Sequence, residues 1–209
     1  MKMKFNCVII AIVFAVELTG SLQAAEVGWS ALHRAVGEAN PIKTRIEAMM
    51  PGVNLNATDA DGNTPLHIAV NSTGALFTNA ELAIRQAIIT ILVRLKANIN
   101  ATNKDGDTPL AFAAKFSDLN AVEQLLKLGA NPNVENNNQK TARNIAEENF
   151  FQARLFNYRY PAGRRLAAHE DILIALVGDL EEAQIIMDRL DAEAEAIAKA
   201  EAASKKTQQ

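Results

Sequence analysis

Three histidines, His33, His67 and His169, are the residues of this 209-residue chain best suited to move a proton near neutral pH. His33 follows a serine by three residues, and His67 follows a threonine by the same spacing. Catalysis through either imidazole needs a nucleophile and an orienting acid at the same site. No motif in the sequence supplies these groups. We therefore expect no catalytic residue.

Two acidic stretches, 59–62 and 103–107, have the composition of calcium-binding loops. A calcium loop places glycine at position six and a bidentate glutamate at position twelve. Here glycine stands fourth, and the two positions twelve are Val70 and Ala114. The stretches are interpreted as tight turns, because glycine permits positive φ. No metal site and no cofactor are expected.

Arginines and aromatic residues alternate between Phe150 and Arg165, which leaves three interpretations open. Arginine beside a stacking ring could bind single-stranded nucleic acid or anionic lipid heads. The aromatics could instead pack a C-terminal interface, with the arginines solvated or paired with nearby glutamates. The third interpretation is a second partner contact, made by Arg154, Tyr158, Arg159, Arg164 and Arg165. A net charge of −3 and an exported location argue against nucleic acid.

The N-terminus has the order of a secretory signal peptide. Lys2 and Lys4 precede the apolar run 8–16, which small residues follow up to Ala24 and Ala25. The run is short for a membrane span, which takes about 20 residues. We expect residues 1–25 to be cleaved near Ala24 or Ala25, so that no stable membrane insertion remains; an uncleaved anchor is the alternative. The only cysteine, Cys7, lies in this segment. The predicted location is periplasmic or secreted.

The remaining chain repeats one sequence pattern. The elements that this pattern forms must position the histidines and the acidic turns. In residues 100–133 an Asp-Gly turn precedes a Thr-Pro helix start, and a second short helix ends at Gly129. Residues 56–69 carry the same turn and helix start, and Thr64, Thr108 and Thr141 are 44 and 33 residues apart. Such a unit has more apolar surface than it can bury alone, so it needs neighbours.

A period near 33 residues with the phrase Thr-Pro-Leu-His-Ile-Ala at 64–69 resembles the ankyrin-repeat family over about residues 28–146. The resemblance implies an all-α solenoid of helix-turn-helix units with short hairpin-like turns, atypical terminal capping repeats and a C-terminal helix. The histidines at the helix starts would make structural hydrogen bonds. The expected units are 26–55, 56–99, 100–133 and 134–167, then a degraded cap 168–190 and an Ala/Glu-rich helical tail 191–209 with a frayed end.

The second unit carries an insertion of 11 residues, the difference between the threonine spacings of 44 and 33. We expect its outer helix to be about two turns longer, beginning at a capping box from Thr78 to Glu81. Lys96 stands where the third unit has Gly129, so it must adopt the left-handed conformation or change the turn.

The resemblance implies a non-enzymatic module that binds another protein through hairpin tips and a concave face of inner helices. The family's contact positions fall on Ala60, Asp61, Asn63, Asn71, Lys104, Asp105, Asp107, Lys115, Asn137, Asn138, Lys140 and Glu148. Two specific versions are an inhibitor or immunity protein of a toxic enzyme, such as a lipase, and a scaffold supporting an exported enzyme, such as a catalase. The rival class is a ligand-binding or enzymatic protein that uses residues 149–165. Partner identity and oligomeric state stay open.

Overall fold

The computed structural model describes residues 30–71, 79–159 and 166–207, and the side chains within these ranges except those of 156–159, 166–168 and 204–207. The described chain is all-helical, as predicted, in the order α2 Ala31–Gly37, α3 Pro41–Ala48, α4 Pro65–Val70, α5 Asn79–Arg94, α6 Pro109–Lys115, α7 Leu119–Lys127, α8 Ala142–Arg159, α9 Leu166–Val177 and α10 Leu180–Thr207. The predicted signal peptide, 1–25, lies outside the described residues. None of the described helices is long and apolar enough to span a membrane.

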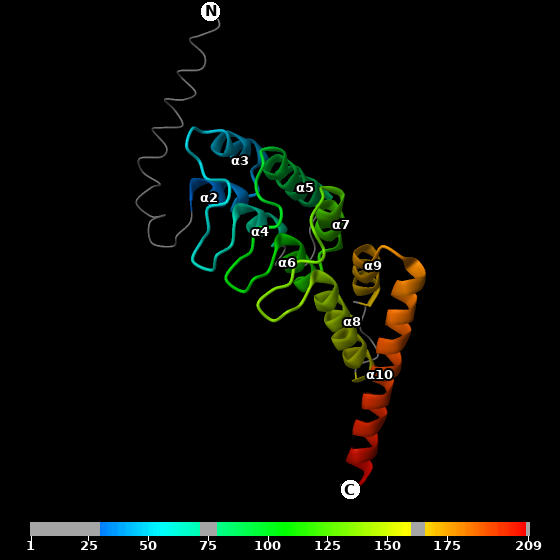
Figure 1. Cartoon of the computed structure of the whole chain (residues 1–209). Coiled ribbons are helices and arrows are strands. Elements are labelled where there is room, and N and C mark those ends of the chain that lie inside the picture. Colours follow the sequence, from blue (N-terminus) through cyan, green and yellow to red (C-terminus); the bar gives the residue numbers. More distant parts are fainter. Residues whose placement is uncertain (1–29, 72–78, 160–165, 208–209) are drawn as a thin grey trace, which may run out of the picture.

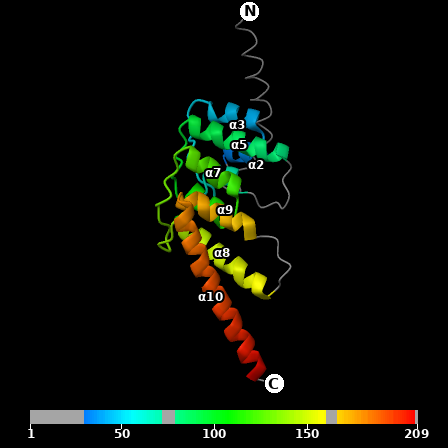
Figure 2. The same ribbon diagram turned by 90° about the vertical axis from the view of Figure 1, so that its right-hand side faces the viewer.

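The helices form two rows (Figure 1). α2, α4, α6 and α8 make an inner row, and α3, α5, α7 and α9 make an outer row that Figure 2 shows one below another. Loops on one side of the inner row project as hairpin tips (Figure 1). α10 packs against both α8 and α9, so it closes the C-terminal end of the stack.

Hydroxyl and amide side chains start the helices. Ser30 and Thr64 begin α2 and α4 with capping boxes in which the third residue is a histidine, and Thr108 caps α6 by accepting a hydrogen bond from the Ala111 amide at 3.2 Å. Asn40 and Asp118 cap the outer helices α3 and α7 in the same way. These bonds satisfy amides that the first helical turn leaves without partners.

Left-handed residues end several helices. Lys96 has φ of 74°, so the first of its two predicted alternatives is right, and Gly129 has φ of 90° in the equivalent position. Ser117, with φ of 58°, reverses the chain between α6 and α7. The serine hydroxyl lies 3.1 Å from Nε2 of His169, which ties this turn to α9.

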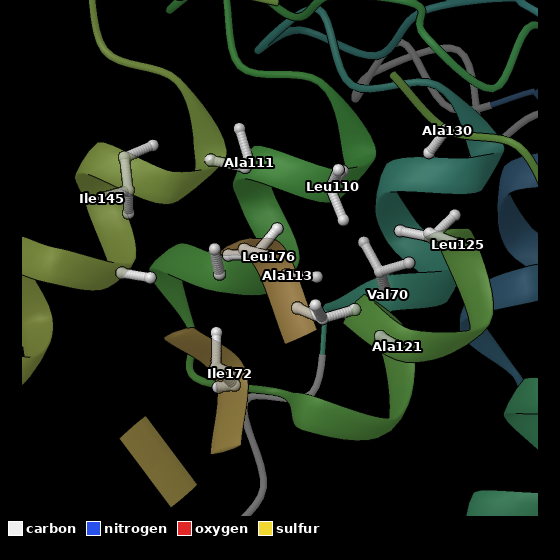
Figure 3. Packing of buried hydrophobic residues seen from close by; sticks show 14 of the residues in the cluster. Val70, Leu110, Ala111, Ala113, Ala121, Leu125, Ala130, Ile145, Ile172 and Leu176 are labelled. Atoms are coloured by element: carbon white, nitrogen blue, oxygen red, sulfur yellow. The ribbon is translucent and has the colours of Figure 1, made fainter. Parts of the chain in front are cut away.

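The core runs between the two rows. Leu32, Leu66 and Leu110 occupy the same position of successive inner helices and are at most 1 % exposed. Figure 3 shows part of this packing, with buried side chains from α4, α6, α7, α8 and α9 directed toward one another. The narrow alanine faces allow the helices to approach closely, and the apolar cluster is continuous across the units, so each unit buries its apolar face against its neighbours.

The outer helix of the second unit is long, as predicted. α5 has 16 residues against 9 in α7. Its described N-terminus is Asn79, and the capping residue that we expected, Thr78, lies outside the described residues. Ile88, Ile89 and Leu92 form its buried stripe.

The C-terminal third departs from the predicted division. α8 is one continuous helix of 18 residues, and α9 takes the outer place of the fourth unit. α10 runs for 28 residues through position 190, so the expected cap is divided between α9 and α10, and its last part forms one helix with the expected tail. The Ala/Glu-rich tail does not face solvent on all sides, since Ala194 near its start is fully buried. α10 packs along α8. The surface of α8 therefore covers the buried side of α10, a contact that the sequence did not reveal.

Candidate protein-interaction surface

Each hairpin tip is built around one carboxylate or amide side chain. Asp59 accepts hydrogen bonds through Oδ1 from the amides of Asp61 and Asn63, at 2.9 and 2.8 Å. Asn103 and Asn136 make the same pair of bonds in the next two tips, all at 3.0 Å. Both calcium-like stretches therefore form turns, organised by Asp59 in the first and by Asn103 in the second, in agreement with the turn interpretation. The part of the chain that the structure describes contains no cluster of three potential metal-ligating His, Cys, Asp or Glu residues.

The tips are joined into a ladder. The amide of Lys104 donates to the carbonyl of Asp61 at 3.1 Å, and the amide of Asn137 donates to the carbonyl of Asp105 at 3.0 Å. Gly62 and Gly106 lie at these crossings with φ of 79°. A Cβ on Gly106 would stand 2.6 Å from the Asn137 nitrogen, so the neighbouring tip leaves room for glycine alone. Gln139, with φ of 57°, fills the equivalent place in the tip that starts at Asn136.

Two buried histidines, His33 and His67, each form a hydrogen bond to a backbone carbonyl of a hairpin tip. Nε2 of His67 donates to the carbonyl of Asp107 at 2.9 Å, so Nδ1 is the acceptor for the Thr64 amide at 3.2 Å. His33 makes the equivalent bonds to the carbonyl of Asn63 and to Ser30. Burial lowers the pKa of His67, against the opposing effects of the Asp107 carbonyl bond and the charges of Asp107 and Asp59. The predicted structural role of these two histidines agrees with this geometry.

Six of the predicted contact residues are exposed at the tips, namely Ala60, Asp61, Lys104, Asp105, Asn137 and Asn138. The ladder holds their backbones in fixed positions along one edge of the molecule. Lys115 is exposed on α6, where its ammonium group lies 3.2 Å from Asp107 and 3.7 Å from Asp105. Lys140 pairs with Glu148 at 2.6 Å. Asn71 ends α4 and is half-buried.

Two predicted contact residues are wrong. Asn63 is 9 % exposed, and Asp107 is 1 % exposed. Asn63 donates to Asp59 and accepts from Asn103, while Asp107 accepts from Asn136 at 2.8 Å. Both residues precede a capping threonine, where the side chain points into the space between adjacent tips. The position therefore serves the ladder and presents no side chain to a partner.

The predicted second contact has a different role at the one residue whose side chain is described. Arg154 forms an ion pair with Asp191 of α10 and lies 6.0 Å from the centre of the Phe150 ring. Its guanidinium group therefore holds the C-terminal helix. Of the three open interpretations, the paired one describes Arg154, with an aspartate as the partner in place of a nearby glutamate. Tyr158 and Arg159 belong to α8, but their side chains lie outside the described ones. Arg164 and Arg165 lie outside the described residues.

The structure adds two residues that the sequence reasoning missed. Phe112 and Phe116 lie on the face of α6 opposite Leu110 and Ala114, and Phe116 is 40 % exposed. Their ring centres are 4.8 Å apart. The sequence contained the information to find them, because the two phenylalanines are four residues apart and lie outside the apolar stripe of α6 that faces the core.

Comparison with protein families gives one match. Residues 76–154 match the family model described as ankyrin repeats (3 copies). No curated protein matches the chain.

Proposed function

Because the chain belongs to the ankyrin-repeat family, we propose that it acts in the periplasm by binding a partner enzyme through its hairpin tips and the exposed side of its inner helices, and thereby inhibits that enzyme. The ladder of tips is the observation that carries the proposal. It holds Asp61, Lys104 and Asp105 exposed on backbones fixed by bonds to the next tip. A frame that is rigid before binding loses little conformational freedom when the partner arrives.

The composition of the surface favours a protein partner over a small ligand. The tips present charged and amide side chains in a row, and a protein surface can contact several of them at once. The imidazoles of His33 and His67 are occupied by hydrogen bonds to the carbonyls of the neighbouring tips. Binding a partner protein requires no proton transfer from them. The scaffold version, in which the chain supports an exported enzyme, uses the same surface.

A pull-down tests the proposal. The chain, tagged at its C-terminus, is recovered from a periplasmic extract of the cells that produce it, and bound proteins are identified by mass spectrometry. A second bait carries Asp61→Arg, Lys104→Glu and Asp105→Arg. A control bait exchanges the exposed pair Glu123 and Lys127 on the outer helix α7, which changes charges away from the tips. We expect a partner that the control retains and the tip variant loses.

The partner's behaviour separates the two versions. An enzyme whose activity falls when the purified chain is added supports inhibition, and an enzyme that loses activity without the chain supports the scaffold. A partner retained equally by both variants would move the contact away from the tips. Failure of any partner to bind would contradict the interaction module in this compartment.

A further inference from the structure

One face of the inner row carries apolar side chains at the edge of the core: Ile68 and Phe112 are partly buried against the core, and Phe116 is 40 % exposed. α6 buries Leu110, Ala111, Ala113 and Ala114, whereas Phe112 and Phe116 lie on its opposite side. Ile68 stands in α4 four residues after the capping Thr64, the position that Phe112 occupies after Thr108. We call Ile68, Phe112 and Phe116 the aromatic ledge.

The ledge is held in place by polar contacts behind it. The Phe112 ring meets the His67 imidazole edge-on, with centres 5.8 Å apart and planes at 84°. Phe116 packs against Phe112 at 62°. The amide of Asn149 on α8 donates to the Ala114 carbonyl at 3.0 Å, which fixes the last turn of α6. An aromatic ring held this way is suited to binding, since little side-chain freedom remains to be lost.

The charges around the ledge are mostly negative. At the tips and the following helix positions, the carboxylates are Asp59, Asp61, Asp105, Asp107 and Glu148, and the lysines are Lys104, Lys115 and Lys140. Two of the lysines are already paired, Lys115 with Asp107 and Lys140 with Glu148. Asp61 has no cation partner among the described residues, and Asp105, whose carboxylate lies 3.7 Å from the Lys115 ammonium group, keeps a side chain that is 69 % exposed. The charge left for a partner therefore favours a cation near the second and third tips.

We propose that the aromatic ledge is the anchor site for a cationic segment of the partner protein. An aliphatic or aromatic side chain of that segment packs beside Phe116, and a lysine or arginine of the same segment pairs with Asp61 or Asp105. Asp105 precedes α6 and Phe116 follows it, and the seven residues of this helix span about 10 Å at 1.5 Å per residue. The inference rests on the proposed function, since it names the chemistry of the partner that the same surface binds.

Site-specific photo-cross-linking tests the anchor directly. The photoreactive residue p-benzoylphenylalanine replaces Phe116 in the full chain, in the cells that produce it. A matched chain carries it in place of Ile42, which is 74 % exposed on the outer helix α3. We expect an adduct at position 116 and none at 42. The cross-linked peptide should contain an apolar side chain with a lysine or arginine about 10 Å away from it, which is about two helical turns or three extended residues.

Substitutions measure the same contact in solution with the captured partner. Phe116→Ser should weaken binding at least about tenfold, as expected for loss of a buried aromatic anchor, and Phe116→Leu should retain most of the affinity. Ile185→Ser, at an exposed apolar position on α10, is the control and should change nothing. Binding should also weaken as salt rises, because the pair at the tips is exposed. Melting curves of the three variants verify that each remains folded.

The outcomes distinguish this inference from the proposed function. A partner that depends on the tip residues but binds Phe116→Ser normally, or an acidic segment cross-linked at 116, overturns the cationic anchor and leaves the interaction module standing. An adduct to lipid, or at position 42 alone, also overturns it. The absence of both an adduct and a tip-dependent partner contradicts both statements.

Discussion

His67 shows how one side chain can join two units. Its two ring nitrogens have fixed and opposite roles, because the Asp107 carbonyl can only accept and the Thr64 amide can only donate. The neutral imidazole satisfies both groups, whereas a protonated ring would place an N–H against the Thr64 amide. The same side chain supports the Phe112 ring. A change at this residue therefore affects the helix cap, the tip ladder and the ledge together.

The protonation of His67 makes stability depend on pH. Burial lowers its pKa in the folded chain below the value of 6.5 for the free side chain, so the unfolded chain takes up a proton first. The stabilising effect is complete above pH 6.5 and declines as the pH falls through the folded pKa. We expect the free energy of unfolding in urea to decrease between pH 7 and 5. In His67→Asn the protein should be less stable at pH 7, and the decrease should be smaller. An unchanged pH dependence in that variant would contradict this assignment.

Among elements, the hairpin tips depend on their neighbours more than on their own sequence. Gly106 and Gly129 both have positive φ, at 79° and 90°. An added Cβ at Gly106 meets the backbone of the next tip, whereas at Gly129 it meets nothing within 4 Å. One glycine therefore serves only a turn, and the other also serves the close approach of two units.

This difference gives a paired prediction. Gly129→Ala introduces only the strain of a left-handed alanine, about 1 kcal/mol. Gly106→Ala adds a collision with the Asn137 backbone at 2.6 Å, and we expect it to lower the free energy of unfolding by at least about 2 kcal/mol. Urea unfolding of both variants measures the difference. Equal losses would mean that the ladder separates at little cost.

On the scale of the whole molecule, the two ends of the stack differ. The first unit leaves an apolar strip of α3 exposed, at Ile42, Ile46 and Met49. The other end is closed by α10, which packs on both rows and is linked to α8 by ion pairs of Arg143 with Glu182 and Arg154 with Asp191. Units of a solenoid stabilise one another through their interfaces, so a closed end supports all the units before it.

Truncation separates the two halves of α10. The buried side chains Ile186, Met187 and Leu190 lie in its first half, and the last buried residue of the described part is Ala194. Removal of residues 198–209 should change the free energy of unfolding by less than about 0.5 kcal/mol. Removal of residues 180–209 should lower it by about 6 kcal/mol, since each large apolar side chain contributes about 2 kcal/mol. Calorimetry and urea unfolding measure both. A stable chain without α10 would show that the cap is dispensable.

The sequence by itself determined the features that depend on nearby residues. The capping threonines, the Asp-Gly turns, the left-handed Gly129 and the long α5 follow from spacing and residue type, and the repeated phrase was sufficient for the fold class. Tertiary structure decided the features that depend on residues far apart in the chain. Asp107 was predicted to face a partner and is buried, because Asn136 of the next tip binds it. Arg154 was a candidate contact with a partner and instead pairs within the chain, because α10 returns along α8 to bring Asp191 beside it. Local sequence patterns do not show such contacts, because the path of the chain and the packing of the helices determine which distant residues lie side by side.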